Sequence, residues 1–344
     1  MNKKMEIKKR ISDGVKVVSF ILVFIVLLEV LSTTVFSKAN ATTYKNKYKH
    51  AYSYVNEKTN TIDIIALGNS DMYSAFCPLK LWDKKGYTST VVASPRQTVA
   101  MSCAMLSSVL EKQSPKFVLL ETDMFYEGVD FPTESKEKKK KKRLPVIPYI
   151  TDEQLTTDIQ NHFTVFLLHD RWKKMIYNYT NIGDDARFNH GYYFNKNIKK
   201  LSPNDNMKYT KDSEELPEET IIYLDKIIDL CKKNDIQLMF FGAPSLTNWS
   251  YARHNAVNEF ATDNDIPFLD FNTLDDYEIN YKRDFRDKGN HMNYYGAKKI
   301  TDYIGNYIKE NYPNALDDKR ENEDYSYWYD DKQKFIEYYN IKKF

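Results

Sequence analysis

The sequence is poor in cysteine and lacks the short motifs that mark metal and phosphate sites. Three cysteines are present, an odd number that argues against a framework of disulfide bonds. No CxxC or HExxH pattern occurs, so nothing local supports a zinc site, and we expect neither a metal nor a cofactor. A glycine-rich phosphate loop is also missing, which makes phosphoryl transfer a poor hypothesis.

A large charge of one sign is missing as well. The chain has 50 Lys and Arg residues against 48 Asp and Glu residues, a formal net charge of +2. No long-range field therefore favours a nucleic acid as partner, and we expect none. With 344 residues the chain is long enough to bury a complete core in one large domain or two smaller ones.

One long apolar run lies near the N-terminus, over residues 17–36. As a helix rising ~1.5 Å per residue it measures about 30 Å, which is enough to cross the apolar core of a bilayer. A basic segment, residues 1–16, precedes it and contains Lys3, Lys4, Lys8, Lys9 and Arg10. Because basic residues favour the cytoplasmic side, we predict a single-pass membrane anchor with a cytoplasmic N-terminus and an extracytoplasmic C-terminal domain.

Two features of this anchor leave alternatives open. Small residues within 37–41 are compatible with cleavage of a signal peptide, although the apolar run is longer than a typical signal core. Glu29 lies inside the run, where a carboxylate either faces a protein partner or lies near the outer interface. The polar residues 37–60 that follow are interpreted as a stalk.

The next part of the chain alternates short apolar runs with amphipathic segments, a pattern typical of an α/β protein. The apolar runs lie at residues 62–67, 90–93, 117–122, 237–241 and 267–270. We therefore predict a three-layer α/β/α sandwich over residues 61–313, with a parallel, doubly wound sheet of five strands. The ligand crevice of such a sheet lies at the carboxyl ends of its strands.

Two regions depart from this alternation. Residues 124–212 contain a lysine run and an aromatic-rich stretch, and are interpreted as an insertion that forms a lid or a partner surface. The lysine run is either a solvated loop or a contact with anionic groups of the membrane or wall. Residues 314–344 are acidic and aromatic, and we expect this tail to pack on the surface.

The first apolar run ends in Gly68, Asn69, Ser70 and Asp71, and a helix or half-ordered loop is expected after it, over residues 72–82. A strand that ends here delivers Ser70 into a sharp turn, where free backbone N–H groups at a helix start can hold an oxyanion. The ordinary alternative is a turn in which the serine only caps the helix.

A second polar segment, residues 283–293, precedes the last periodic helix. It carries Asp287 and His291 a few residues apart, so both side chains can face one crevice as a general base and the carboxylate that orients it. Asn293 is expected to cap the helix that follows. Either residue of the pair alone can be an ordinary loop residue, but their combination with Ser70 favours a nucleophilic site.

These two segments, residues 68–71 and residues 287–297, resemble the SGNH/GDSL hydrolase superfamily. In that family a serine follows the first strand, and an Asp-x-x-His motif precedes the last helix. The chain is most similar to the membrane-anchored branch that works beside membrane-bound O-acyltransferases, in alginate acetylation and in the D-alanylation of teichoic acids. Residues 169–172 are similar to a segment of the same branch.

The chain departs from the family pattern at three places. The Asp-x-x-His spacing falls on Lys288, so the orienting acid is Asp287 or Asp284. In its second sequence block the family has a glycine that binds the oxyanion, and in its third block an asparagine. In this chain residues 94–97 stand in place of that glycine, and Asp123 stands in place of the asparagine.

The resemblance nevertheless implies an acyl-transfer site. Ser70 would attack an acyl group, His291 would act as base, and Asp287 or Asp284 would orient the imidazole. The oxyanion would be held by the Ser70 and Asp71 backbone N–H groups with Arg96 or Gln97. The oxyanion and substrate contacts that we expect are therefore Asn69, Asp71, Arg96, Gln97 and Asp123.

The function implied is transfer of an acetyl or other short acyl group to a cell-surface polysaccharide or teichoic acid. A membrane-bound O-acyltransferase is the expected partner in the membrane. Two alternatives remain, namely a surface carbohydrate esterase that uses the same residues, and a catalytically inactive adaptor for the acyltransferase.

Overall fold

The computed structural model describes residues 3–37, 49–127, 159–160, 162–168, 186–342 and 344 of the chain. These residues form one sheet of five strands: β1 (Ile64–Gly68), β2 (Ser89–Ala93), β3 (Phe117–Glu121), β4 (Gln237–Gly242) and β5 (Phe268–Asp270). All neighbouring strands are parallel, in the order β2-β1-β3-β4-β5. The predicted parallel sheet of five strands is therefore confirmed.

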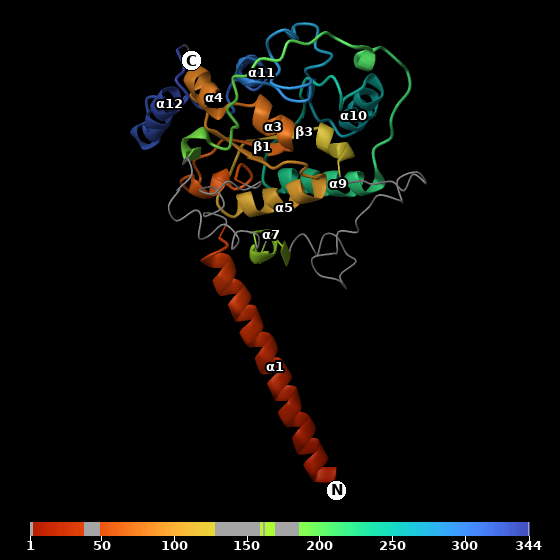
Figure 1. Ribbon diagram of the computed structural model, residues 1–344, viewed down its shortest axis with the longest axis vertical. Coiled ribbons are helices and arrows are strands. Elements are labelled where there is room, and N and C mark those ends of the chain that lie inside the picture. The colour runs from red at the N-terminus through yellow and green to blue at the C-terminus, as the bar shows by residue number, and fades with distance from the viewer. Residues whose placement is uncertain (1–2, 38–48, 128–158, 161, 169–185, 343) are drawn as a thin grey trace.

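Helices cover both faces of this sheet, as Figure 1 shows. On one face, α5 (Val99–Leu110), α9 (Glu218–Lys233) and α10 (Tyr251–Asp263) contribute side chains to one apolar cluster. On the other face, α3 (Ser70–Ala75) and α11 (Tyr294–Asn311) contribute to a second cluster. The three-layer α/β/α architecture is thus confirmed, and its core lies on both sides of a sheet whose central strands are fully buried.

The order of the strands places two polar turns next to each other. The chain passes from β1 to β2 on one side, and then returns to β3 on the other side of β1. At such a reversal the loops after the two central strands separate and leave a crevice. Ser70 follows β1 and Asp123 follows β3, so both residues lie at this crevice.

Residues 72–82 belong to two short helices, where one helix or a loop was expected. α3 ends at Ala75, and α4 (Pro78–Lys85) begins after two residues with extended backbone. Pro78 has no N–H group to continue a helix, which explains the break. The N–H group of Cys77 donates instead to the Thr301 hydroxyl at 2.9 Å, and this bond ties the break to α11.

The N-terminal apolar run forms α1 (Lys3–Thr33), which projects from the rest of the molecule in Figure 1. Its segment Lys9–Thr33 is long and apolar enough to cross a membrane. The helix starts within the basic segment, so no break separates residues 3–16 from the apolar run. Glu29 has a partner within the chain, because its carboxylate lies 3.0 Å from Nε2 of His162.

The predicted stalk, residues 37–60, is too long at its C-terminal end. Residues 49–60 pack into the α/β domain, where Tyr52 and Tyr54 are buried. The Ser53 hydroxyl donates to the Val91 carbonyl at 2.6 Å and lies 2.8 Å from the Thr90 hydroxyl. The polar composition of this segment concealed its role, since its few aromatic side chains supply the buried contacts.

The acidic tail packs on the domain through α12 (Tyr327–Tyr338). Trp328 is fully buried, and its ring stacks on the ring of His190 at 3.8 Å between centroids. Nδ1 of His190 lies 2.7 Å from the Glu57 carboxylate, and Nε2 lies 3.4 Å from that of Asp331. Burial disfavours the charged imidazole, but these two carboxylates outweigh it and raise the pKa of His190 to about 9.

Part of the predicted insertion, residues 124–212, is described. Tyr193 donates its N–H group to the Tyr73 carbonyl at 2.8 Å, and Tyr294 donates to the Asn195 carbonyl at 2.7 Å. Residues near 193 therefore cover α3 and the start of α11, close to the crevice. The lysine run and residues 169–172 lie outside the described residues.

Candidate active site

Ser70 is presented by the turn between β1 and α3. Gly68 ends the strand, and a side chain there would meet Glu121 and Met72 at 2.6 Å, so only glycine fits. Asn69 caps α3, because its Oδ1 accepts the Asp71 N–H at 2.8 Å. Ser70 is the first residue of the helix, so its own N–H group has no acceptor within α3 and remains a candidate oxyanion donor.

The loop before α11 is held rigidly by its own backbone. Phe285 and Met292 form an antiparallel bridge across it. Asn293 caps α11 as expected, accepting the N–H groups of Tyr295 and Gly296 at 2.9 and 3.2 Å. These contacts fix the position of residues 286–291 relative to the end of β1.

The structure brings Ser70, His291 and Asp287 together in a line of hydrogen bonds. Nε2 of His291 lies 2.9 Å from the Ser70 hydroxyl, and Nδ1 lies 2.5 Å from Oδ2 of Asp287. Burial opposes the charge on Asp287, but hydrogen bonds from His291 and the backbone lower its pKa to about 2. A hydroxyl, an imidazole and an ionised carboxylate in this order form the arrangement used for nucleophilic catalysis.

Asp284, the alternative acid, lies elsewhere in the loop. Its Oδ2 accepts from Lys299 Nζ at 2.8 Å and from the Asn280 N–H at 2.9 Å, and the residue is only 1% exposed. Asp287 is therefore the acid that contacts His291, despite the longer spacing.

Three of the expected oxyanion donors are engaged elsewhere. The N–H group of Asp71 belongs to the cap made by Asn69. Nε2 of Gln97 donates to the Val92 carbonyl at 3.1 Å and to the Ser102 hydroxyl at 2.9 Å. The Arg96 side chain is 79% exposed and pairs with Glu127 at 3.2 Å. The expectation that Arg96 or Gln97 helps to hold the oxyanion is therefore wrong, because the Gln97 amide bonds to β2 and α5 and the Arg96 guanidinium pairs with Glu127 beyond β3.

Asn69 and Asp123 do meet at the crevice, and two further carboxyl groups lie with them. Nδ2 of Asn69 donates to Oδ2 of Asp123 at 3.1 Å. Asp71 and Glu121 are buried beside Asp123, and burial together with the neighbouring carboxylates raises the pKa of all three acids. Glu121 was not predicted, although an acid at the end of a buried strand was a visible signal.

Aromatic rings and one cation flank the serine. The Tyr73 ring, on α3 shortly after Ser70, lies 5.8 Å from Tyr193 and 4.9 Å from His50. The Arg286 guanidinium lies 4.6 Å above the Tyr193 ring. Burial and the nearby Lys49 charge lower the pKa of His50 to about 3, so this imidazole is neutral at pH 7. Sequence reasoning missed His50 and Tyr193 because they come from distant segments, and it assigned no role to Tyr73 and Arg286, although both lie in the two segments of the site.

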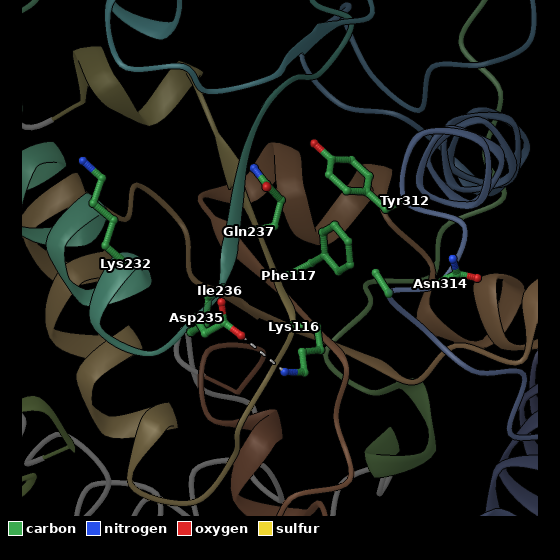
Figure 2. A pocket seen from close by; sticks show the side chains of 9 residues that line it. Lys116, Phe117, Lys232, Asp235, Ile236, Gln237, Tyr312 and Asn314 are labelled. Atoms are coloured by element: carbon green, nitrogen blue, oxygen red, sulfur yellow. Dashed lines mark ion pairs between the residues drawn. The ribbon is translucent and has the colours of Figure 1, made fainter.

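A surface pocket of about 440 Å³ lies at the amino ends of the strands, opposite the end of the sheet that carries Ser70 (Figure 2). Lys116, Gln237 and Tyr312 line it, at the amino ends of β3 and β4 and after α11. Ser70 follows the carboxyl end of β1, so this pocket is separate from the candidate active site.

Comparisons with known proteins give little further support. No protein-family model matches the chain, and no curated protein matches it. Among solved structures, it is similar to a Bacteroides fragilis protein described as a "putative acylhydrolase". That match has a TM-score of 0.37 and 11% sequence identity, and covers 76% of this chain and 95% of that chain. The function proposed below therefore rests on the geometry of the site.

Proposed function

We propose that the chain is a membrane-anchored serine esterase or acyltransferase of the SGNH type. The observation that supports this most directly is the line of hydrogen bonds from Ser70 through His291 to Asp287. Ser70 attacks an acyl ester while His291 accepts the hydroxyl proton, and Asp287 stabilises the imidazolium. The Ser70 N–H group at the start of α3 holds the oxyanion.

The acyl-serine formed in this step then gives its acyl group to a second nucleophile. His291 returns the proton to the leaving alcohol and removes one from the incoming hydroxyl, which belongs either to water or to a glycan. An acetyl or other short acyl group on a cell-surface polysaccharide or teichoic acid is the substrate that we favour. The apolar helix α1 supports this choice, because it would keep the domain at the membrane surface, beside a membrane-bound O-acyltransferase.

The complete hydrogen-bond chain also argues against an inactive adaptor. A binding module has no need for an imidazole held between a hydroxyl and an ionised carboxylate at 2.9 and 2.5 Å. Replacing any one of the three side chains would leave the binding function of such a module unchanged.

The proposal is tested with the full-length chain in detergent micelles and a chromogenic acetyl ester. We expect hydrolysis that falls by more than about 10³-fold in Ser70→Ala, because the nucleophile is lost. Ser107→Ala is the matched control and should retain activity, because the Ser107 hydroxyl donates to the Cys103 carbonyl within α5, away from Ser70. A fluorophosphonate probe should label Ser70 in the parent chain.

The same assay separates the alternatives. Faster turnover with an added glycan acceptor, together with acylated glycan, supports a transferase, whereas release of free acid alone supports an esterase. Equal turnover in the parent chain and in Ser70→Ala would instead support the adaptor.

A further inference from the structure

Arg286 lies in the loop that carries the candidate base, directly before Asp287. Its backbone N–H group donates to the His291 carbonyl at 3.2 Å, so Arg286 is held across the loop from the imidazole. The side chain is only 12% exposed, although it carries a positive charge. A guanidinium that is this well buried needs hydrogen bonds or a counter-charge to offset the loss of water.

The neighbouring carboxylate does not supply these hydrogen bonds. Nε of Arg286 lies 3.8 Å from Oδ2 of Asp287, which is too far for a hydrogen bond. That oxygen already contacts Nδ1 of His291, and Oδ1 accepts three backbone N–H groups. Among the residues that the structure describes, the guanidinium contacts this carboxylate and one aromatic ring and donates no hydrogen bond.

The aromatic ring holds the guanidinium in a fixed place beside the serine. The guanidinium lies 4.6 Å from the centre of the Tyr193 ring, as in a cation–π contact. The Tyr193 N–H group donates to the Tyr73 carbonyl at 2.8 Å, and the two rings lie 5.8 Å apart. Tyr73 is three residues after Ser70 on α3, so both residues lie on the same face of that helix. The cation is therefore fixed between the loop of the base and the helix of the nucleophile.

A second arginine near the crevice, Arg253 on α10, has its donors occupied. Nε and Nη2 donate to the Glu214 carboxylate at 3.1 and 3.0 Å, and Nη1 donates to the Asn248 carbonyl at 2.6 Å. Arg253 therefore stabilises the fold around it. Arg286 differs because its hydrogen-bond donors remain available to a group from outside the described chain.

We propose that Arg286 binds an anionic oxygen group of the substrate, a carboxylate or a phosphate, and makes the site selective for anionic esters. Both groups present pairs of oxygens that match the fork of donors on a guanidinium. The buried Tyr73 ring and the Tyr193 ring limit the water around the cation, which strengthens such a contact. This specificity-determining role rests on the proposed function, because it concerns the ester that Ser70 attacks.

Three acetate esters of similar size test the selectivity. They are 2-acetoxyethanol, which is neutral, 2-acetoxyethyl phosphate and 3-acetoxypropanoate. We expect the full-length chain in micelles to cleave at least one anionic ester with a kcat/KM about 10–100-fold above that of the neutral ester, the range for one hydrogen bond between charged groups. The ester with the higher ratio identifies the anion that is bound. An equal kcat/KM for all three esters would overturn the proposal.

Replacing Arg286 separates selectivity from a role in supporting the loop. In Arg286→Gln we expect kcat/KM for the preferred anionic ester to fall about 10–100-fold, mainly through KM, while the neutral ester is affected much less. Arg286→Lys keeps the charge without the fork and should retain part of the preference. A fall in kcat that is the same for all three esters would mean that Arg286 only supports the loop, and would overturn the proposal.

Arg283→Gln is the matched control for these variants. Arg283 lies in the same loop, and its guanidinium is also 4.6 Å from an aromatic ring, that of Tyr295, but the residue is exposed. This variant should keep the activity and the selectivity of the parent chain. Circular dichroism verifies that each variant is folded.

Binding without turnover gives a separate readout. Full-length Ser70→Ala chain labelled with ¹⁵N-arginine is titrated with 2-hydroxyethyl phosphate, 3-hydroxypropanoate and ethanediol. The Nε–H signals of Arg286 and Arg283 are each assigned by their loss in the corresponding Lys variant. The Arg286 signal should move and saturate with the preferred anion but not with ethanediol, while the Arg283 signal stays in place. An Arg286 signal that moves with neither anion would overturn the proposal.

The two readouts distinguish this inference from the proposed function. Saturable binding of an anion at Arg286, in a parent chain that cleaves none of the esters, would support the anion site and count against the proposed function. Cleavage of the three esters without any preference, and with no anion bound at Arg286, would support the function and overturn the anion site.

Discussion

The two oxygens of the Asp287 carboxylate have different partners. Oδ2 contacts Nδ1 of His291, while Oδ1 accepts the backbone N–H groups of Gly289, Asn290 and His291 at 3.2, 3.0 and 3.1 Å. Gly289 has φ +104, and a side chain there would meet Leu246 at 2.7 Å, so the turn depends on glycine. This turn is what allows an acid four residues before the histidine to orient its ring.

Replacing Asp287 by Asn should therefore damage the proposed catalysis far more than the fold. The amide is uncharged and cannot stabilise an imidazolium, so we expect kcat/KM for an acetyl ester to fall by about 10²–10⁴-fold. Asp284→Asn is the matched control, since Asp284 lies in the same loop but pairs with Lys299. It should lower the melting temperature while activity per folded molecule is retained. The reverse pattern would show that Asp284 is the functional acid.

At the residue scale, sequence reasoning succeeded where a side chain is presented by its own local turn. Asn293 caps α11 as expected, and Ser70 lies with Asp287 and His291, which share one short loop. It failed for Gln97, because the number of acceptors near a turn is not visible in the sequence. Gln97 is fully buried and donates to Val92 and Ser102, and both of these residues lie outside the segment 94–97 on which the prediction was based.

At the scale of elements, α12 is attached to the domain by a buried charge as well as by aromatic rings. His190 lies between Glu57, near η1 (Ser53–Asn56), and Asp331 on α12. Only a protonated imidazole forms both ion pairs, so the packing of three separate segments against each other depends on the protonation of His190.

The stability of the domain should accordingly fall at alkaline pH. The folded state raises the pKa of His190 from 6.5 to about 9, so its contribution is complete below about 6.5 and is lost as the pH rises through 9. One pKa unit corresponds to about 1.4 kcal/mol, so the loss is on the order of 3 kcal/mol. Urea unfolding of the full-length chain at pH 6 and pH 10 measures it.

The His190→Gln variant serves as the control for this experiment. It should be less stable at pH 6 and should lose little further stability between the two pH values. A parent chain whose stability relative to His190→Gln is the same at pH 6 and pH 10 would contradict a charged His190.

The elements that sequence could predict are those whose own residues repeat a pattern. β1 and β3 are almost entirely apolar, and α5 (Val99–Leu110) is a single continuous apolar helix. Residues 49–60 and α12 mix aromatic residues with many polar and charged ones, and their docking depends on contacts with segments more than thirty residues away, such as Ser53 with Val91. Contacts between residues so far apart in the sequence leave no periodic signal. The predicted stalk therefore extended too far, and the position of the tail on the domain could not be predicted.

At the scale of the whole molecule, α1 and the α/β domain contact each other within the chain. The Thr164 hydroxyl donates to the Phe36 carbonyl at 2.6 Å and to the Ser32 carbonyl at 3.1 Å, at the C-terminal part of α1 and just beyond it. α7 (Val165–Leu168) starts at the next residue and lies beside this end of the helix (Figure 1). Together with the pair of Glu29 and His162, these contacts would hold the domain close to the membrane surface.

Charges placed in the middle of α1 should release the chain from the membrane. Val23 and Ile25 are exposed on the helix, and Asp at both positions would cost about 2.5–3.5 kcal/mol each at the centre of a bilayer. We expect the parent chain to remain in the pellet after alkaline carbonate extraction, and the double Asp variant to move to the soluble fraction. Ile198→Asp is the matched control, because Ile198 is also apolar and exposed but lies in the α/β domain, so this variant should stay in the pellet. A double Asp variant that is still retained would mean that α1 is not what holds the chain in the membrane, and the choice of a membrane-surface substrate would lose its main support.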